Sequence, residues 1–260
     1  MFMMLQDKVA VVTGVNREIG LAMAEELAGA GARVLAAHFG EAERVMPLVE
    51  RVRAAGGTIE LCDADLRVVA ECQRVVAEAV RHFGRVDLLA ANAGLSLGHP
   101  FLEEDEATID TLFSLNLKGA FFCAQAAARQ MVAQGIGAGQ HAPYRIVFTA
   151  SVTGVKAAPG MAGYAVTKAG VRHLATTLAV ELGQYGITVN AIAPGAVLNE
   201  RNLADHPDYA ARWAALTPVG RVGQPRDIAA ALRFLVSDQA EWLSGQTLIV
   251  DGGWSVQGLH

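Results

Sequence analysis

The fold is decided by the stretch Lys8-Val-Ala-Val-Val-Thr-Gly-Val-Asn-Arg-Glu-Ile-Gly20. Its first part, Lys8–Thr13, is rich in β-branched residues, which predicts a short buried strand. A turn containing glycine follows and leads into the helical pattern Ile19–Ala30. Small residues in such a turn let the backbone approach a pyrophosphate, whose charge the amino end of a helix favours. The stretch therefore predicts a strand–turn–helix unit that binds phosphate.

Strand and helix patterns continue to alternate along the chain. Further strands are expected at Arg33–Ala37, Thr58–Cys62, Val86–Ala91, Arg145–Ala150, Ile187–Ile192 and Gln246–Val250. Further helices are expected at Glu41–Ala55, Val68–Phe83, Glu106–Gln134, Gly163–Tyr185 and Pro225–Ser237. This alternation predicts right-handed crossovers and one α/β domain over residues 1–260, with a doubly wound parallel sheet of about seven strands and helices on both faces.

Composition is consistent with that domain and narrows the function. The 260 residues are 52% hydrophobic, as suits a sheet covered on both faces, and the net charge of −5 gives no support for nucleic-acid binding. No apolar run reaches membrane-spanning length, and Met1–Leu5 is too short for a signal peptide. Neither the three scattered cysteines nor the seven histidines have metal-ligand spacing. We therefore expect a cytoplasmic protein without a metal site.

Polar or small residues follow the predicted strands, where an open parallel sheet binds its ligand. Besides the first turn, these positions hold Asp65-Leu66, Asn92-Ala93-Gly94, Ser151 and Pro194-Gly195. Because the carboxyl ends of parallel strands meet at one edge, five separate segments are expected to converge on one site.

Tyr164 and Lys168 are spaced to share one face of a helix, about one turn apart. A free phenol has a pKa of about 10 and is a poor base at neutral pH. A cation beside it is expected to lower that pKa, so that the tyrosine can exchange a proton with an alcohol or a carbonyl. With Ser151 as a hydroxyl donor, the set suits hydride transfer at a carbinol carbon.

From Lys8 to Trp254 the chain resembles the short-chain dehydrogenase/reductase family. The resemblance is carried by the Thr13–Gly20 turn, Asp65, Asn92-Ala93-Gly94, Asn116, Ser151, Tyr164-x-x-x-Lys168, Pro194-Gly195 and Val250-Asp-Gly-Gly253. It implies a Rossmann-type, nicotinamide-dependent oxidoreductase of small molecules that assembles as a homotetramer.

The resemblance also implies roles for individual residues. Tyr164 would be the acid/base, Ser151 would bind the substrate oxygen, Lys168 would lower the tyrosine pKa and hold the nicotinamide ribose, and Asn116 would interrupt its helix and position a relay water. The expected cofactor contacts are Gly14, Asn16, Arg17, Ile19, His38, Asp65, Leu66, Asn92, Ala93, Gly94, Tyr164, Lys168, Pro194, Gly195, Val197 and Asn199.

Glu18 departs from the family turn, which has glycine at this position. If the backbone there requires a positive φ, glutamate costs roughly 1–2 kcal/mol. Its carboxylate would in that case also lie near the cofactor phosphates and repel them. The alternative is that Glu18 points outward as an acid at the start of a helix, which the helix dipole favours.

The choice between NAD and NADP depends on the end of the second strand. An NAD enzyme usually has an acid there for the ribose 2′-hydroxyl, whereas this chain has His38, with Glu41 three residues further on. Arg17, and His38 when protonated, would suit a 2′-phosphate, although Glu18 adds negative charge. The balance favours NADP over NAD.

The segment expected to cover the substrate, about residues 196–220, is polar and charged. Its Asn199-Glu-x-Asn-Leu203 pattern is similar to that of sugar 1-dehydrogenases of the family, and it favours a sugar or polyol substrate. Asn199 replaces a common threonine and would bind the carboxamide or cap a helix. The alternatives are a 3-oxoacyl thioester reductase, another alcohol or ketone oxidoreductase, and a binding protein that kept the fold but lost turnover.

Overall fold

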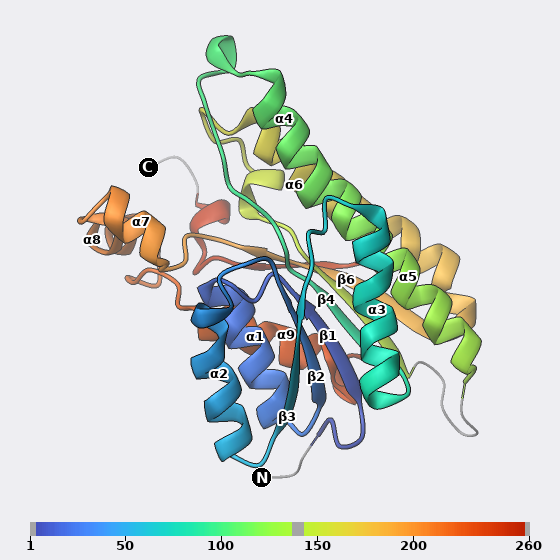
Figure 1. Cartoon of the computed structure of the whole chain (residues 1–260). Helices are drawn as coiled ribbons and strands as arrows, with labels where there is room; N and C mark the ends of the chain where they lie inside the picture. Colours follow the sequence, from blue (N-terminus) through green and yellow to red (C-terminus); the bar gives the residue numbers. More distant parts are fainter. Residues whose placement is uncertain (1–3, 137–142, 258–260) are drawn as a thin grey trace.

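The computed structural model describes residues 4–136 and 143–257 of the chain. Its centre is one parallel sheet of seven strands in the order β3-β2-β1-β4-β5-β6-β7 (Figure 1). The strands are β1 Val9–Thr13, β2 Arg33–His38, β3 Thr58–Asp63, β4 Leu88–Ala91, β5 Tyr144–Thr149, β6 Ile187–Pro194 and β7 Thr247–Val250. The expected doubly wound sheet is confirmed, and its order reverses between β1 and β4, which is where such sheets bind ligands.

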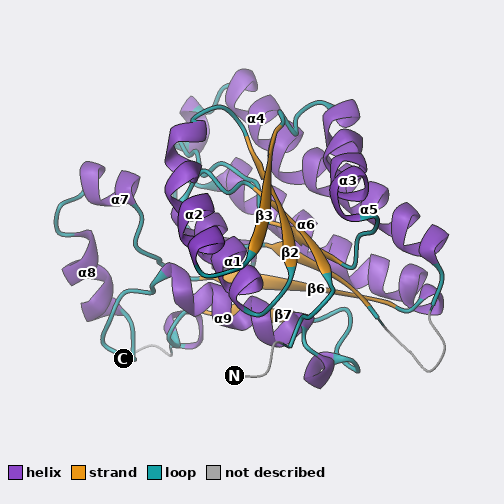
Figure 2. Ribbon diagram, turned by 60° about the horizontal axis from the view of Figure 1, so that its bottom comes forward, coloured by secondary structure: helices purple, strands orange, loops and turns teal. Residues whose placement is uncertain are grey.

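Helices cover both faces of the twisted sheet, which Figure 2 shows from a second direction. They are α1 Glu18–Gly29, α2 Ala42–Ala54, α3 Val69–Phe83, α4 Glu106–Leu112, α5 Ala120–Gln134, α6 Ala162–Leu182, α7 Glu200–Asp205, α8 Tyr209–Leu216 and α9 Pro225–Val236. One core packs α1, α2 and α9 on the sheet, and the other packs α3, α5 and α6 on its opposite face. Because both faces are covered, strands such as β1 are buried at every residue.

Two elements differ from the expected pattern. The single helix expected over Glu106–Gln134 is divided into α4, a π-helical segment at Phe113–Gly119, and α5. The stretch expected to be irregular after β6 contains the short helices α7 and α8, which lie apart from the two helical layers at the left of Figures 1 and 2. Periodicity misses both features, because a π turn and a short helix depend on local hydrogen bonds.

No helix within residues 4–136 and 143–257 combines the length and the apolar character that a membrane crossing requires.

Candidate active site

The glycine turn after β1 packs directly against the segment that follows β4. Gly14 has a φ of +71°, and a Cβ atom there would lie 2.6 Å from Ala93 Cα. A Cβ on Gly20 would overlap the carbonyl oxygen of Gly14. Arg17, which precedes α1, makes no side-chain cap to the first turn of that helix. The close backbone and the uncapped helix start fit a bound pyrophosphate.

A chain of hydrogen bonds runs from this turn across three strand ends. Thr13 Oγ1 accepts from the backbone nitrogens of Asn92 at 3.0 Å and Ala93 at 3.1 Å. Thr149 Oγ1 donates to Asn92 Oδ1 at 3.1 Å, and Lys168 Nζ donates to the carbonyl oxygen of Thr149 at 2.7 Å. The glycine turn after β1 and Lys168 are therefore linked through the ends of β1, β4 and β5.

Tyr164, Lys168 and Ser151 meet at the start of α6. Lys168 Nζ lies 5.8 Å from the centroid of the Tyr164 ring, one helical turn away. Ser151 is buried just beyond β5 and hydrogen-bonds the Tyr164 phenol. Ser151 Oγ also accepts from Thr153 Oγ1 at 3.0 Å, which orients the serine hydroxyl. A hydroxyl donor, a phenol and an ammonium thus surround one point at the edge of the sheet.

Burial shifts the pKa of both titrating groups of the pair. It raises the pKa of the Tyr164 phenol, with the hydrogen bond to Ser151 acting in the opposite direction. It lowers the pKa of Lys168 to about 8. Burial dominates both shifts, because loss of solvent disfavours the charged form of each group. That Lys168 lowers the tyrosine pKa stays a prediction.

Asn116 lies in the π-helical segment and is buried, so the expected interruption of the helix is present. Its side chain accepts from Leu95 N at 2.8 Å and donates to Leu95 O at 2.9 Å. A Cβ atom on Gly94 would lie 3.1 Å from Asn116 Oδ1 and 3.2 Å from Lys168 Nζ. Gly94, Asn116 and Lys168 therefore line one narrow space.

Asn16 and Arg17 lie beside the end of β2. Asn16 Nδ2 donates to the carbonyl oxygens of Phe39 at 3.1 Å and Gly40 at 3.0 Å. Arg17 forms an ion pair with Glu41 at 3.0 Å, and Glu41 is one of two described non-glycine residues with a left-handed φ. The Arg17 guanidinium, expected to suit a 2′-phosphate, is therefore paired with an acidic side chain in this structure.

His38, Asp65 and Leu66 lie at the ends of β2 and β3. His38 is buried, and its Nδ1 lies 2.8 Å from the carbonyl oxygen of Gly40. The Asp65 carboxylate is paired with Arg67 at 2.7 Å, and this contact lowers the pKa of Asp65. Leu66 is buried, and its carbonyl oxygen lies next to Gly119.

The segment after β6 packs against β7 and the chain beyond it. Gly195 N donates to Val250 O at 3.0 Å, and a Cβ on Gly195 would lie 2.6 Å from Asp251 Cβ. Val197 is buried and pairs with Gly223. Asn199 caps α7 by accepting from Asn202 N at 2.8 Å, so the helix-cap alternative is present in the structure.

Glu18 is the first residue of α1 and is not among the residues with a positive φ, so the backbone strain considered above does not arise. Its carboxylate does not simply face solvent, because Oε1 accepts from the backbone nitrogen of Glu200 at 2.7 Å. Sequence reasoning missed this contact, which joins residues 182 positions apart. Only the fold brings them together.

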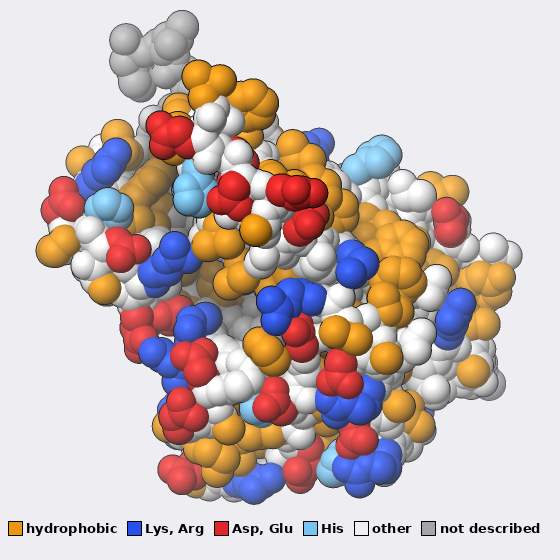
Figure 3. Space-filling model, turned by 45° about the horizontal axis from the view of Figure 1, so that its top comes forward, with side chains coloured by type: hydrophobic (Ala, Val, Ile, Leu, Met, Phe, Trp, Pro, Cys, Tyr) orange, Lys and Arg blue, Asp and Glu red, His pale blue; other side chains and the backbone are white. Residues whose placement is uncertain are grey.

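The lid expected near residues 196–220 includes α7 and α8. The surface is hollowed between the lobe that these helices form, at the left of Figure 3, and the rest of the molecule. In α8, Trp213 contacts Trp254 edge-on with ring centroids 5.5 Å apart. Lys156 Nζ lies 4.7 Å from the Trp254 ring centroid. The Trp213–Trp254 contact attaches α8 to the segment that follows β7.

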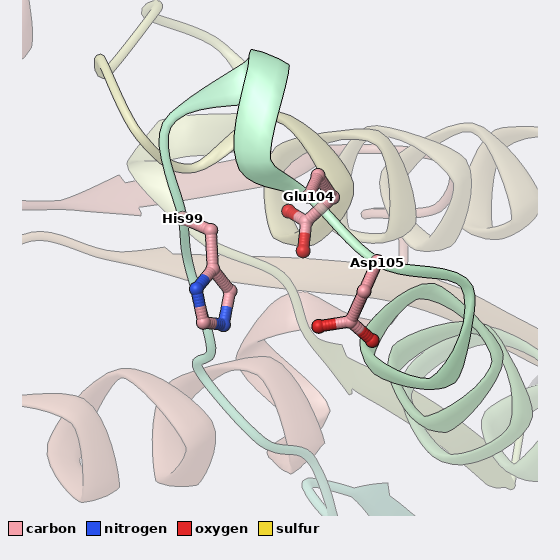
Figure 4. A group of neighbouring side chains, drawn as sticks. All are labelled: His99, Glu104 and Asp105. Atoms are coloured by element: carbon pink, nitrogen blue, oxygen red, sulfur yellow. The ribbon is translucent and has the colours of Figure 1, made fainter.

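One group of potential metal ligands occurs within the described ranges, formed by His99, Glu104 and Asp105 (Figure 4). Asp105 already caps α4 by accepting from Thr108 N at 2.8 Å, and His99 and Asp105 are exposed. Spacing along the chain did not reveal this group, because the loop before α4 folds back to place His99 beside the two acids. We assign no ion-binding role to it.

Comparison with known proteins shows which family has a similar sequence. A family model described as enoyl-(acyl carrier protein) reductase matches residues 14–255. The chain is 38% identical over 256 residues to L-rhamnose 1-dehydrogenase (NAD(P)(+)) of Azotobacter vinelandii, covering 96% of this chain and 98% of that protein. It is 36% identical over 250 residues to 3-oxoacyl-[acyl-carrier-protein] reductase of Staphylococcus aureus, covering 96% and 99%.

A solved structure with a similar fold belongs to a protein of the same kind. The fold is similar to that of a short-chain dehydrogenase/reductase from Serratia marcescens, with a TM-score of 0.89, 33% identity, and coverage of 97% of this chain and 99% of that one. The chain therefore belongs to the short-chain dehydrogenase/reductase family and is a nicotinamide-dependent oxidoreductase that acts on CH–OH groups of small molecules.

Proposed function

We propose that the protein oxidises the carbinol carbon of a sugar or polyol, as an aldose 1-dehydrogenase does, with Tyr164 as the acid/base. The observation that carries the substrate class is the 38% identity, over 96% of the chain, to a protein named L-rhamnose 1-dehydrogenase. The polar lid supports it: α7, Glu200–Asp205, offers carboxylate, guanidinium and amide groups that can hydrogen-bond hydroxyls.

The positions of the side chains support the proposed catalytic roles. Ser151 donates a hydrogen bond to the substrate oxygen, and the deprotonated Tyr164 oxygen accepts the hydroxyl proton as the C–O bond gains double-bond character. Lys168 lies near enough to stabilise the phenolate, and Asn116 holds the wall of the same space. The nicotinamide, when bound, supplies the hydride acceptor for oxidation and the hydride donor for the reverse reaction.

The cofactor would bind along the carboxyl edge of the sheet. Gly14, Asn16 and Ile19 would meet its phosphates and ribose, and Ala93 and Gly94 would form the wall beside them. Asp65 and Leu66 would contact the adenine end of the cofactor. The nicotinamide end would be held by Lys168, Pro194, Gly195, Val197 and Asn199.

We infer a preference for NADP over NAD. Arg17 and Arg44 both lie beside Glu41 at the end of β2, where a 2′-phosphate would compete with that carboxylate for the two guanidinium groups. His38, buried close by, replaces the acid that would bind a 2′-hydroxyl. Michaelis constants for both cofactors test this preference, and a clearly lower constant for NAD would refute it.

A reductase of 3-oxoacyl thioesters is the second candidate, favoured by the 36% identity to 3-oxoacyl-[acyl-carrier-protein] reductase. An acidic carrier protein would require a basic docking surface, whereas the chain has 26 acidic residues against 21 lysines and arginines. The sugar assignment therefore takes precedence.

One assay separates the candidates. Aldoses, polyols and acetoacetyl thioester are each offered with NAD and NADP in the matching redox state, and the change in nicotinamide absorbance is followed. Oxidation of an aldose or polyol is expected to exceed thioester reduction in kcat/KM. Turnover of the thioester alone would replace the first proposal by the second, and the absence of any turnover would favour a binding protein.

We also propose a homotetramer. Apolar side chains remain exposed on adjoining elements of one helical layer: Phe113 in the π-helical segment, Phe121 on α5 and Val166 on α6. Exposed apolar residues on long helices suit association of subunits. Light scattering on the purified protein should give four times the chain mass, and a monomer would contradict the proposal.

We infer a cytoplasmic location, because Cys62, Cys72 and Cys123 are free and buried thiols. Fractionation of cells should recover the protein with cytoplasmic markers.

A further inference from the structure

Glu18 connects the cofactor turn to the lid. The family turn has glycine at this position, and here the carboxylate accepts from the backbone nitrogen of Glu200 at 2.7 Å. Glu200 is the first residue of α7, directly after Asn199. A carboxylate beside the N–H groups at a helix start is electrostatically favourable. The contact thus gives the Glu18 carboxylate a hydrogen-bond partner in the lid.

A second contact converges on the same lid residue. Arg44 on α2 forms an ion pair with the Glu200 carboxylate at 2.7 Å and another with Glu41 at 3.1 Å. Exposed ion pairs of this kind stabilise weakly one at a time. Here, however, Glu18 holds the backbone of Glu200 while Arg44 holds its side chain, so the first residue of α7 is fixed from two different helices.

The contacts border a small pocket between the turn and the lid. Its volume is about 150 Å³, and it is lined by Asn16, Arg17, Glu18, Leu21, Arg44 and Glu200. The pocket therefore draws its wall from both the cofactor turn and the lid. At its other end the lid is attached separately, through the Trp213–Trp254 contact.

We propose that Glu18 and Arg44 are positioning residues that hold the start of the substrate lid, and with it Asn199, against the cofactor turn. The inference rests on the proposed function only in assigning residues 196–220 to the substrate. The docking of α7 is independent of which substrate is used. Without these contacts α7 is free to leave the turn, while the glycine positions of the turn itself are unchanged.

Limited trypsin digestion of the full-length protein tests the docking without substrate or cofactor. The lid contains two arginines, Arg201 and Arg212, at which cleavage can be timed by mass spectrometry. Glu18→Ala and Arg44→Met should each accelerate cleavage there by roughly three- to tenfold, the change expected from losing one exposed polar contact. Glu18→Gln should cleave like the wild type, because its amide oxygen still accepts from Glu200 N.

Glu25→Ala is the matched control. Glu25 also lies on α1, but its carboxylate pairs with Arg51 at 2.9 Å rather than with the lid. This variant should leave the cleavage rates at Arg201 and Arg212 unchanged. Kinetics supply a second readout: in Glu18→Ala the substrate KM should rise by roughly the same factor, whereas in Glu25→Ala it should stay at the wild-type value.

Unchanged cleavage at Arg201 and Arg212 in both Glu18→Ala and Arg44→Met would overturn the proposal. Acceleration spread equally over arginines in the two helical layers would also overturn it, since it would indicate a general loss of stability. If the wild type oxidises no sugar, the proposed function fails, but the digestion result still decides whether Glu18 docks the lid.

Discussion

At the scale of single residues, burial governs the reactive pair. The pKa of Tyr164 is raised and that of Lys168 is lowered to about 8, so each side chain shifts toward its neutral form. A Tyr164 phenolate and a Lys168 ammonium would stabilise each other, because opposite charges attract strongly where water is excluded. The pair is therefore suited to exchanging a proton, although neither partner is ionised more easily than in water.

Replacement of the phenol tests its role directly. Tyr164→Phe should lower kcat by about 10²–10⁴-fold, the usual contribution of a general acid or base, while the affinity for the cofactor is retained. Stopped-flow turnover and fluorescence titration of the nicotinamide measure the two quantities. Tyr185→Phe, at an exposed tyrosine, serves as the control and should behave like the wild type. Near-normal turnover in Tyr164→Phe would remove the acid/base assignment.

The buried lysine makes stability depend on pH. Its pKa is about 8 in the folded chain and higher when unfolded, so the unfolded state binds more protons between those values and stability rises with pH in that window. Lys168→Met should therefore be stabilised relative to the wild type at pH 7, and the difference should shrink by up to about 3 kcal/mol by pH 10. Urea unfolding measures it. A difference that stays constant from pH 7 to 10 would show that Lys168 carries no such penalty.

At the scale of elements, the π-helical segment between α4 and α5 delivers a polar side chain to the site. Periodicity predicts one helix over this region, and the structure changes its winding at Phe113–Gly119. Such segments occur frequently at functional sites, because the extra residue per turn reorients a side chain. Here it directs Asn116 to the backbone of Leu95, and so holds the chain after β4 beside Lys168.

Loss of that amide should cost stability as well as activity. Asn116→Leu keeps the approximate volume but leaves the backbone nitrogen and oxygen of Leu95 without their partner. Each of these partly buried hydrogen bonds contributes about 0.5–1.5 kcal/mol, and the variant should lose at least that much free energy of unfolding. Gln73→Leu, at an exposed site on α3, is the control and should change stability little. Equal stability of the two variants in urea would count against the structural role of Asn116.

At the scale of the whole molecule, the sheet brings the separate site segments together. The chain reverses its strand order between β1 and β4, so the turn after β1, the segment after β4 and the segment after β5 lie at one edge. The hydrogen-bond chain from Thr13 to Lys168 crosses these three strand ends. Anything that loosens the sheet is therefore expected to disturb the site.

The interior strand β5 offers a test of how the core is assigned. Phe148 is fully buried in the core beneath α5 and α6, and Phe148→Ala should lower the free energy of unfolding by about 3–5 kcal/mol. Phe234→Ala, at a residue with 41% of its surface exposed, should cost clearly less. Thermal and urea unfolding compare the two. A smaller loss for Phe148 than for Phe234 would contradict the assignment of the core.

The sequence alone determined the α/β class, the doubly wound parallel sheet of about seven strands, and the convergence of Asn92, Ser151, Tyr164 and Lys168. It could do so because apolar periodicity and residue type at strand ends are local properties of the chain. It did not include the burial that raises the Tyr164 pKa, and it missed the partner of Glu18. Only the tertiary structure decided these, because desolvation and a hydrogen bond to Glu200 depend on which distant segments pack together, and no local pattern records that.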